Sequence, residues 1–401
     1  MALGDVNMER MRAFTRRGSR DLRLLAMAAF CVWFGFGAYM ATAVNFAVQL
    51  LDIQAYQQGI VESAREMPGF MMVLVAALTM RVSESLLGSF ALILVALGMA
   101  AYYGIHSFTM LIVYSVVWSI GLHVWMTVQP SMVLNLSDAG NKGRRLGQIA
   151  AVQSLGTILG MSLVLLVGKA IGMRAIFLVA GFVIMLGAVA AAMISRNVGH
   201  QEKPRFVWKR KYSLYYVLTF LEGCRKQVFM TFAIFALVRN YGTGIQMVAI
   251  LMIFNNLANI ALAPKVGRLI DRIGERKVLA FCYSALIPVF IGYALVRHVH
   301  VLYVLYCLDS LFFLGSIGLN TYLHQITESR DLMPSLAMGV SMNHAAAVIV
   351  PVVGGLIWMK FGYQTTFFGG AAVVAISVLT VLRMKPHTPA EILEPVPAGG
   401  E

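Results

Sequence analysis

The sequence predicts an all-α polytopic membrane protein with twelve transmembrane helices in two pseudo-symmetric six-helix bundles. Of the 401 residues, 59% are hydrophobic and only 12% are charged, whereas soluble domains carry about 25% charged residues. The mean hydropathy is +0.76. Apolar stretches of roughly 20 residues, long enough to cross a bilayer core of about 30 Å, recur along the whole chain. A polar stretch near the middle, residues 196–212, divides them into two sets of six.

Each apolar stretch predicts one span, and short polar connections join the spans. In chain order the predicted spans are residues 22–49, 56–80, 85–104, 108–135, 146–168, 173–194, 213–239, 244–266, 277–296, 299–326, 333–359 and 363–383. The predicted domains are a basic N-terminus (1–21), a six-helix bundle (22–195), a linker (196–212), a second six-helix bundle (213–384) and a tail (385–401).

The positions of the basic residues predict the orientation of the chain. The net charge is +14, but the charges cluster beside the predicted spans, so we expect no nucleic acid partner. Connections on one side are richer in Lys and Arg, which is typical of cytoplasmic loops. We therefore expect a bacterial-type cytoplasmic (inner) membrane protein with both termini in the cytoplasm. The largest basic clusters are Arg10, Arg12, Arg16, Arg17, Arg20 and Arg23 before the first span, and Lys203, Arg205, Lys209, Arg210 and Lys211 in the linker.

No motif of an enzyme or a cofactor site stands out. The four cysteines lie inside apolar stretches without metal-ligand spacing, and nothing resembles a nucleotide-binding loop or a catalytic triad. We expect no enzymatic activity, no cofactor and no resident metal ion. The expected partners are the lipid bilayer, a small solute and protons, and the chain is expected to be monomeric.

A short basic connection lies between the apolar stretches 245–266 and 278–296. Its spacing is G-x-x-x-D-R-x-G-x-R-K, formed by Gly267, Asp271, Arg272, Gly274 and Arg276, followed by a lysine. This pattern closely resembles the loop signature of the major facilitator superfamily of transporters. In that family the signature lies between helices 2 and 3 and recurs in weaker form between helices 8 and 9. The resemblance implies a conformational role for these residues, and two halves that alternate access to a site at mid-membrane depth.

The two halves also resemble each other. Residues 146–194 slide onto residues 336–384 so that Gly172 meets Gly362, as a fold with internal repeats predicts. The counterpart of the basic connection, residues 78–88, keeps Arg81 and Glu84 but lacks the two glycines and the aspartate at their places. A latch built on this signature would therefore depend on the second copy or on other contacts.

Ionisable residues inside predicted spans are expensive and mark candidate sites. Glu62, Arg65 and Glu66 lie on one face of the second span, where Arg65 can pair with either carboxylate. Burial favours the protonated form of the remaining carboxylate, so Glu62 and Glu66 are candidates for proton coupling. The alternative is a structural ion pair that holds this span to a neighbour.

The seventh span carries Glu222, Arg225, Lys226 and Gln227 near its middle. A guanidinium offers a planar fork for a carboxylate or phosphate, and Glu222 can neutralise only one of the two cations. Arg225, Lys226 and Gln227 are therefore candidates for binding an anionic solute, with internal pairing as the alternative. Asp309 in the tenth span is either a proton carrier or a partner of Arg225.

Uncharged and aromatic residues at similar depth complete the candidate set. Asn343 and His344 lie mid-way along the eleventh span, where a histidine suits solute contact, proton coupling or a hydrogen-bonded core position. Trp33 can wall an organic solute or simply pack. Asn255 can contact a solute or join helices by hydrogen bonds, and His123 is read as a helix-joining residue.

These observations predict a secondary active transporter of a small anionic organic solute, coupled to protons and working by alternating access. Three alternatives stay open: an assembly factor or sensor of the same fold that does not transport, a flippase for an amphiphile, and a soft-metal transporter. The last rests on 25 methionines and the pairs Met67/Met71 and Met338/Met342, since thioethers select soft metals.

Overall fold

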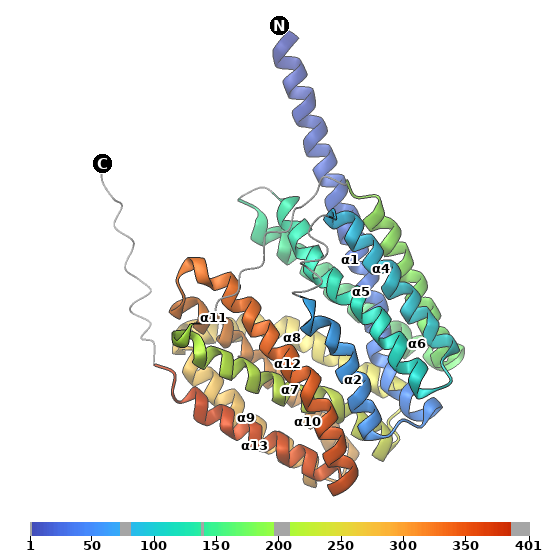
Figure 1. The fold of residues 1–401 in the computed structure, drawn as a ribbon, viewed down its shortest axis with the longest axis vertical. Coiled ribbons are helices and arrows are strands. Elements are labelled where there is room, and N and C mark those ends of the chain that lie inside the picture. The colour runs from blue at the N-terminus through green and yellow to red at the C-terminus, as the bar shows by residue number, and fades with distance from the viewer. Residues whose placement is uncertain (1, 73–81, 138–139, 196–208, 386–401) are drawn as a thin grey trace. The chain divides into compact units, whose positions relative to one another are not determined.

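The computed structural model describes residues 2–72, 82–137, 140–195 and 209–385, and every regular element within these ranges is a helix (Figure 1). The chain divides into two compact units. The first comprises Met1–Pro204 and Gly242–Ile253, and the second comprises Arg205–Tyr241 and Phe254–Glu401. Most of the predicted linker, Arg81 of the first loop copy and residues 386–401 of the predicted tail lie outside the described ranges.

The first unit is built from α1 (Ala2–Leu51), α2 (Ala55–Phe70), α4 (Glu84–Ala100) with the short helix η1 (Ala101–Gly104), α5 (Phe108–Asn135) and α6 (Lys142–Ala192). The predicted N-terminus 1–21 is helical from Ala2 and continues directly into the first span. α6 packs along α1 and α4, and α5 packs against α4 and α2. Glycines allow the closest of these approaches, since a Cβ at Gly160 of α6 would overlap the carbonyl oxygen of Phe34 on α1.

The second unit has α7 (Ser213–Tyr241) at its centre. The other elements are η2 (Arg210–Tyr212), α8 (Ile245–Ile273), α9 (Glu275–Leu295), α10 (Val299–Phe313), η3 (Leu314–Ser316), α11 (Ile317–Ile326), α12 (Ser329–Phe361) and α13 (Tyr363–Val381). α7 contacts α12, α13, α10 and α11. Residues 245–253 of α8 group with the first unit, and the rest of α8 with the second.

Within the described ranges, 9 helices are long and apolar enough to cross a membrane. One of them, α6, contains a break at Gly172 that separates the predicted spans 146–168 and 173–194. α7 has the length but carries three charged residues in its middle, and only 16 residues of α2 are described. The helices are therefore consistent with the twelve predicted spans. The predicted span 299–326 is α10, η3 and α11 in succession.

In the described part of the chain, four glycines with positive φ separate successive helices, among them Gly242 (φ 66°) between α7 and α8. Gly172, Gly274 and Gly362 have φ of 79°, 86° and 86°, a region that residues with a Cβ rarely adopt. The predicted connection at residues 267–277 is therefore not an extended loop, because α8 runs to Ile273 and α9 begins at Glu275. One glycine makes the turn. The predicted match of Gly172 with Gly362 is confirmed in the backbone, since both glycines take the same conformation between two helices.

Each unit has a buried glutamate at an equivalent position, and the sequence comparison did not align the two. Glu84 opens α4 and accepts a hydrogen bond from Ser131 Oγ at 2.6 Å near the end of α5. Glu275 opens α9 and accepts one from Gln325 Nε2 at 2.5 Å near the end of α11. Sliding residues 78–88 onto 267–277 instead places Glu84 opposite Ile273. The helix starts therefore correct that alignment by two residues.

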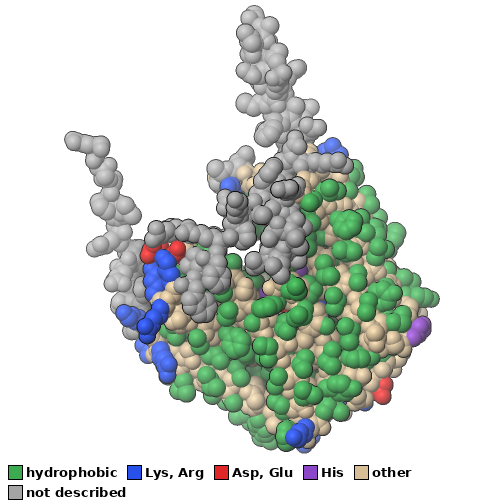
Figure 2. Space-filling view, in the orientation of Figure 1, with side chains coloured by type: hydrophobic (Ala, Val, Ile, Leu, Met, Phe, Trp, Pro, Cys, Tyr) green, Lys and Arg blue, Asp and Glu red, His purple; other side chains and the backbone are tan. Residues whose placement is uncertain are grey.

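The exposed surface is largely apolar. Leu166 is 78% exposed and Phe182 is 66% exposed, although large apolar side chains are usually buried in soluble proteins. Figure 2 shows hydrophobic side chains over most of the visible face, while the charged side chains lie near its margins. Such a surface is suited to contact with lipid chains.

Candidate functional site

The second unit contains a buried ion-pair group around Arg225. This side chain is 1% exposed. Its Nε and Nη2 atoms donate to Glu222 Oε2 at 3.2 Å and Oε1 at 2.5 Å, and its Nη1 donates to Asp309 Oδ1 at 3.3 Å. The guanidinium also stands over the Phe313 ring, 5.0 Å from the centroid. Glu222 is one turn before Arg225 on α7, whereas Asp309 comes from α10.

A cavity of about 160 Å³ adjoins this group within the second unit. It is lined by residues from α7, α8 and α10: Arg225, Lys226, Phe229, Met230, Asn255, Tyr306, Asp309, Ser310 and Phe313. Aromatic rings form much of the wall, and a few polar groups are distributed among them. This combination is typical of sites for small organic ligands.

The charges around the cavity balance. Glu222 and Asp309 are acidic, Arg225 and Lys226 are basic, and all but Glu222 line the cavity. The sequence left open whether Asp309 carries a proton or pairs with Arg225, and the structure shows the pairing. Arg225 therefore holds two carboxylates at once, and an incoming anion has to compete with them.

Asn255 lines the same cavity and carries an unsatisfied polar atom. Its side chain is 7% exposed, and its Oδ1 has no hydrogen-bond partner in the described part of the chain. Most buried polar groups are hydrogen-bonded, so such an atom needs an explanation. The sequence placed Asn255 among residues that either contact a solute or join helices.

Other predicted binding residues lie away from this cavity. Gln227 is on α7 and is buried, and Asn343 and His344 are on α12. Within the described ranges none of the three lines the cavity. α12 approaches α7 closely at Gly223, where a Cβ would lie 3.1 Å from Cα of Asn343. This contact is one of helix packing. Trp33 belongs to the first unit and meets Phe36 edge to face, with ring centroids 5.4 Å apart.

The residues of the G-x-x-x-D-R-x-G-x-R-K pattern lie at the α8–α9 junction. Gly267, Asp271 and Arg272 are in the last turns of α8, Gly274 makes the turn, and Arg276 is in the first turn of α9. The residues of the pattern therefore lie in the C-terminal turns of α8, at the single glycine between the helices, and in the first turn of α9.

In the first unit the structure brings Glu62, Arg65 and Glu66 together as predicted. Arg65 forms an ion pair with Glu62 and lies 3.5 Å from Glu66 Oε1. Glu62 also accepts a hydrogen bond from Gln58 Nε2 at 3.1 Å. Arg65 thus contacts both acids instead of choosing one. With two acids and one base, the group carries a formal charge of −1.

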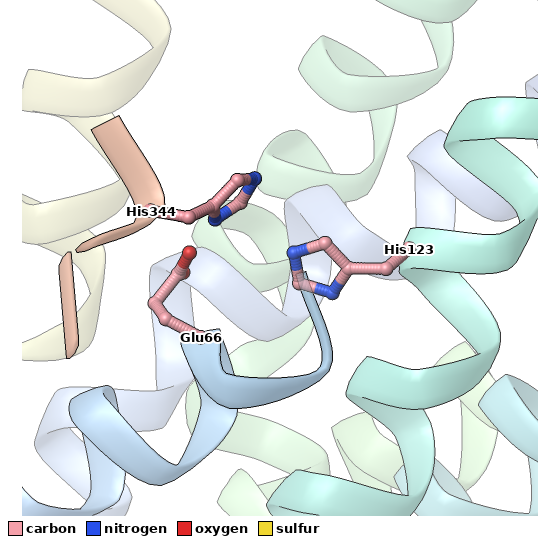
Figure 3. Close-up of side chains that lie close together, drawn as sticks. All are labelled: Glu66, His123 and His344. Carbon is pink, nitrogen blue, oxygen red and sulfur yellow. The ribbon is translucent and has the colours of Figure 1, made fainter. Parts of the chain in front are cut away.

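His123 also lies near this group, and the sequence analysis did not predict that position. Its Nδ1 lies 2.9 Å from the carbonyl oxygen of Ser119, an acceptor only, so Nδ1 carries the hydrogen. Figure 3 shows its ring beside Glu66, and a ring nitrogen lies within 4.8 Å of the carboxylate. The figure also draws His344, which belongs to the second unit. Because α2 and α5 are separate in sequence, no local pattern could pair Glu66 with His123.

Comparison with known families identifies the fold. The model of the Major Facilitator Superfamily matches residues 25–323 and, in a second match, residues 215–400. The chain belongs to the Major Facilitator Superfamily. A search of curated proteins finds no match to it.

Solved structures of superfamily transporters share the fold. The nucleoside transporter NupG is 13% identical, with a TM-score of 0.75 over 91% of this chain and 100% of that one. A bacterial homologue of the human lysosomal transporter Spinster, in an inward-facing and unoccupied conformation, is 12% identical, with a TM-score of 0.70 over 91% and 96%. A POT family transporter in complex with a thioalcohol-conjugated peptide is 14% identical, with a TM-score of 0.72 over 90% and 95%.

This superfamily member is therefore a multi-pass membrane protein with a transporter fold. The family match confirms the resemblance that the α8–α9 pattern carried. At these identities the solved structures support only the fold. The chemical class of the solute has to be inferred from this chain's own residues.

Proposed function

We propose that this chain is a secondary active transporter that carries a small organic anion together with a proton. The observation that supports it is the buried Arg225, which contacts Glu222 and also Asp309 on the wall of a ligand-sized cavity. A guanidinium presents several donors in one plane, so a solute carboxylate can take the place of one of its partners.

The charge balance of this group links the anion to a proton. An anion that binds Arg225 displaces the contact with Asp309 and leaves that carboxylate uncompensated in a buried setting, which is strongly unfavourable. A proton on Asp309 removes the negative charge and frees Nη1 of Arg225 for the solute. One proton then accompanies each negative charge on the solute, and the group stays neutral.

The first unit offers a second place for a proton. Glu62, Arg65 and Glu66 carry a formal charge of −1 in a largely apolar bundle, which a bound proton would cancel. Glu62 is engaged by Arg65 and Gln58, and the contact between Arg65 and Glu66 is longer, at 3.5 Å. Glu66 is therefore the carboxylate we propose to titrate, with His123 beside it.

Localisation follows from the same proposal. We place the chain in a bacterial-type cytoplasmic membrane with both termini in the cytoplasm and with access alternating between the two sides. Support comes from the basic residues at helix ends, such as Arg144 and Arg145 at the start of α6 and Arg276 and Lys277 at the start of α9.

Substitutions at Arg225 test the proposal. Purified protein in proteoliposomes is assayed for uptake of mono- and dicarboxylates and phosphate esters, with and without an imposed proton gradient. Arg225→Ala should abolish binding and uptake of the anion. Arg225→Lys should keep the charge but lose most of the affinity, because an ammonium lacks the planar fork. Full uptake by Arg225→Ala would sink the anion proposal.

A further inference from the structure

We infer that the solute is a ring-bearing carboxylate that also carries an N–H or O–H donor, with the carboxylate on Arg225 and the donor on Asn255 Oδ1. The inference rests on the proposed function, because it takes the anion site at Arg225 as given. It adds the body of the solute and the second polar group that the cavity recognises.

Asn255 supplies the evidence for the donor. Its Oδ1 is buried and unpartnered in the described part of the chain, and Asn255 lines the same cavity as Arg225. An amide oxygen only accepts hydrogen bonds, so its complement on a ligand is a donor. Leaving a buried acceptor unsatisfied is costly, which makes the atom selective for ligands that satisfy it.

The wall and the volume supply the evidence for the ring. Phe229 and Tyr306 lie nearly parallel, with centroids 6.0 Å apart and an angle of 16° between the planes, and Phe313 stands under the guanidinium. An apolar cavity of about 150 Å³ accepts benzene, and this one measures about 160 Å³. A single ring with its substituents therefore fills it, and faces of aromatic side chains are available for contact.

The two polar residues come from different helices, Arg225 from α7 and Asn255 from α8. A solute that reaches both needs a carboxylate and a separate hydrogen-bond donor. An acyclic acid such as acetate can satisfy Arg225 but has no group for Asn255. Benzoate fills the space but also leaves Oδ1 unsatisfied.

The test is a ligand series measured on the intact protein. Dissociation constants are determined calorimetrically at pH 5.5 for benzoate, the three hydroxybenzoates, the three aminobenzoates and the three methoxybenzoates, with acetate and succinate as acyclic acids. At least one hydroxy- or aminobenzoate isomer should have a dissociation constant at least about tenfold lower than that of benzoate. The methoxy compounds, which only accept hydrogen bonds, should gain nothing.

Two variants locate the effect. Asn255→Leu removes the acceptor at similar size and should reduce the tenfold preference for the donor-bearing isomer over benzoate to about threefold or less. Asn256→Leu, at the neighbouring position of α8 and outside the cavity wall, should keep the preference. If Asn255→Leu does not fold, the ligand series on the unaltered protein still decides.

Each contrary result has a defined meaning. Equal affinity for benzoate and every donor-bearing isomer, or equal gain from methoxy groups, overturns the assignment of Asn255. Binding of acyclic acids alone, lost in Arg225→Ala, overturns the ring but leaves the proposed anion transport intact. Binding of no acid of either kind removes both the inference and the proposed function beneath it.

Discussion

In the proposed mechanism, proton coupling in the second unit depends on Asp309. This residue lies on the cavity wall and contacts Arg225 at 3.3 Å, so under this proposal its charge state decides whether the guanidinium can accept a solute. Neutral Asp309 leaves one side of the guanidinium to the solute, and ionised Asp309 competes for it.

Asp309→Asn should therefore abolish pH-driven accumulation while anion binding persists. Asparagine resembles the protonated acid, so affinity should no longer weaken between pH 5.5 and 7.5 as it should in the unaltered protein. Uptake into proteoliposomes and calorimetric binding at the two pH values measure this. Glu275→Gln, at a buried acid outside the cavity, serves as control. Accumulation against a gradient by Asp309→Asn at the unaltered level would falsify coupling through this residue.

Glu222 is expected to matter for stability more than for specificity. Its two contacts with Arg225 are fully enclosed. Glu222→Gln should lower the free energy of unfolding by about 3–5 kcal/mol, because it removes one partner of a buried ion pair. Thermal unfolding in detergent measures the loss.

An exposed acid provides the comparison for Glu222→Gln. Glu328 pairs with Lys211 at 2.9 Å, and both side chains are about half exposed. Glu328→Gln should leave the melting temperature nearly unchanged, since exposed pairs contribute little. Equal melting temperatures for the two variants would contradict the structural weight given to the Arg225 group.

Among the helices, α1 and α6 show how closely the chain packs. Gly160 and Gly37 bring backbone against backbone, and a Cβ at either would overlap a carbonyl oxygen of the other helix. Small residues at helix contacts are a common means of association in membranes, where lipid chains are as apolar as the helices themselves.

Gly160→Val should destabilise the first unit, by about 1–3 kcal/mol or more, because backbone atoms cannot move aside as a flexible side chain can. Gly147→Ala on the same helix is the matched control. A Cβ at Gly147 meets nothing within 4 Å, and alanine favours a helix over glycine by up to about 1 kcal/mol. The melting temperature should fall in the first variant and hold or rise in the second. A Gly160→Val protein as stable as the original would refute the close approach.

For the molecule as a whole, the orientation in the membrane is the expectation most open to experiment. Lys142 and Lys169 both lie on α6, on either end of its first span, and 27 residues of helix at about 1.5 Å each cover roughly 40 Å. The two lysines should therefore face opposite sides of the bilayer.

Cysteine substitution distinguishes the sides. Lys169→Cys should react with a membrane-impermeant maleimide in right-side-out vesicles, and Lys142→Cys only in inverted vesicles. The unaltered protein is the control, because three of its cysteines are buried and Cys307 is only partly exposed. The reverse labelling pattern would place the N-terminus outside the cytoplasm.

Much of the fold could be predicted because it depends on local hydrophobicity. The span predicted at 108–135 is α5, Phe108–Asn135, and the match of Gly172 with Gly362 located two equivalent turns. Loop geometry was predicted less well. The chain between residues 267 and 277 remains helical except at Gly274, since a single glycine with positive φ is sufficient to reverse it.

The site could be predicted only as a set of candidates. A charge inside an apolar stretch is visible in the sequence because its cost in a membrane is a property of that stretch alone, and this applied to Arg225, Asp309 and Glu66. Which candidates meet is a matter of packing between helices. The pairing of Arg225 with Asp309 joins residues 84 apart. A carboxylate oxygen of Glu66 on α2 lies within 4.8 Å of a ring nitrogen of His123 on α5.

Span lengths, charge asymmetry and the repeat could be predicted from the sequence alone. Each segment that crosses a bilayer must be long and apolar enough, and must satisfy its own backbone hydrogen bonds. The balance of charge at Arg225, the place of His123 and the unsatisfied oxygen of Asn255 emerged from the folded chain. These features are contacts, or missing contacts, between α2 and α5 in the first unit and among α7, α8 and α10 in the second. Their energies depend on distances and burial that no sequence spacing specifies.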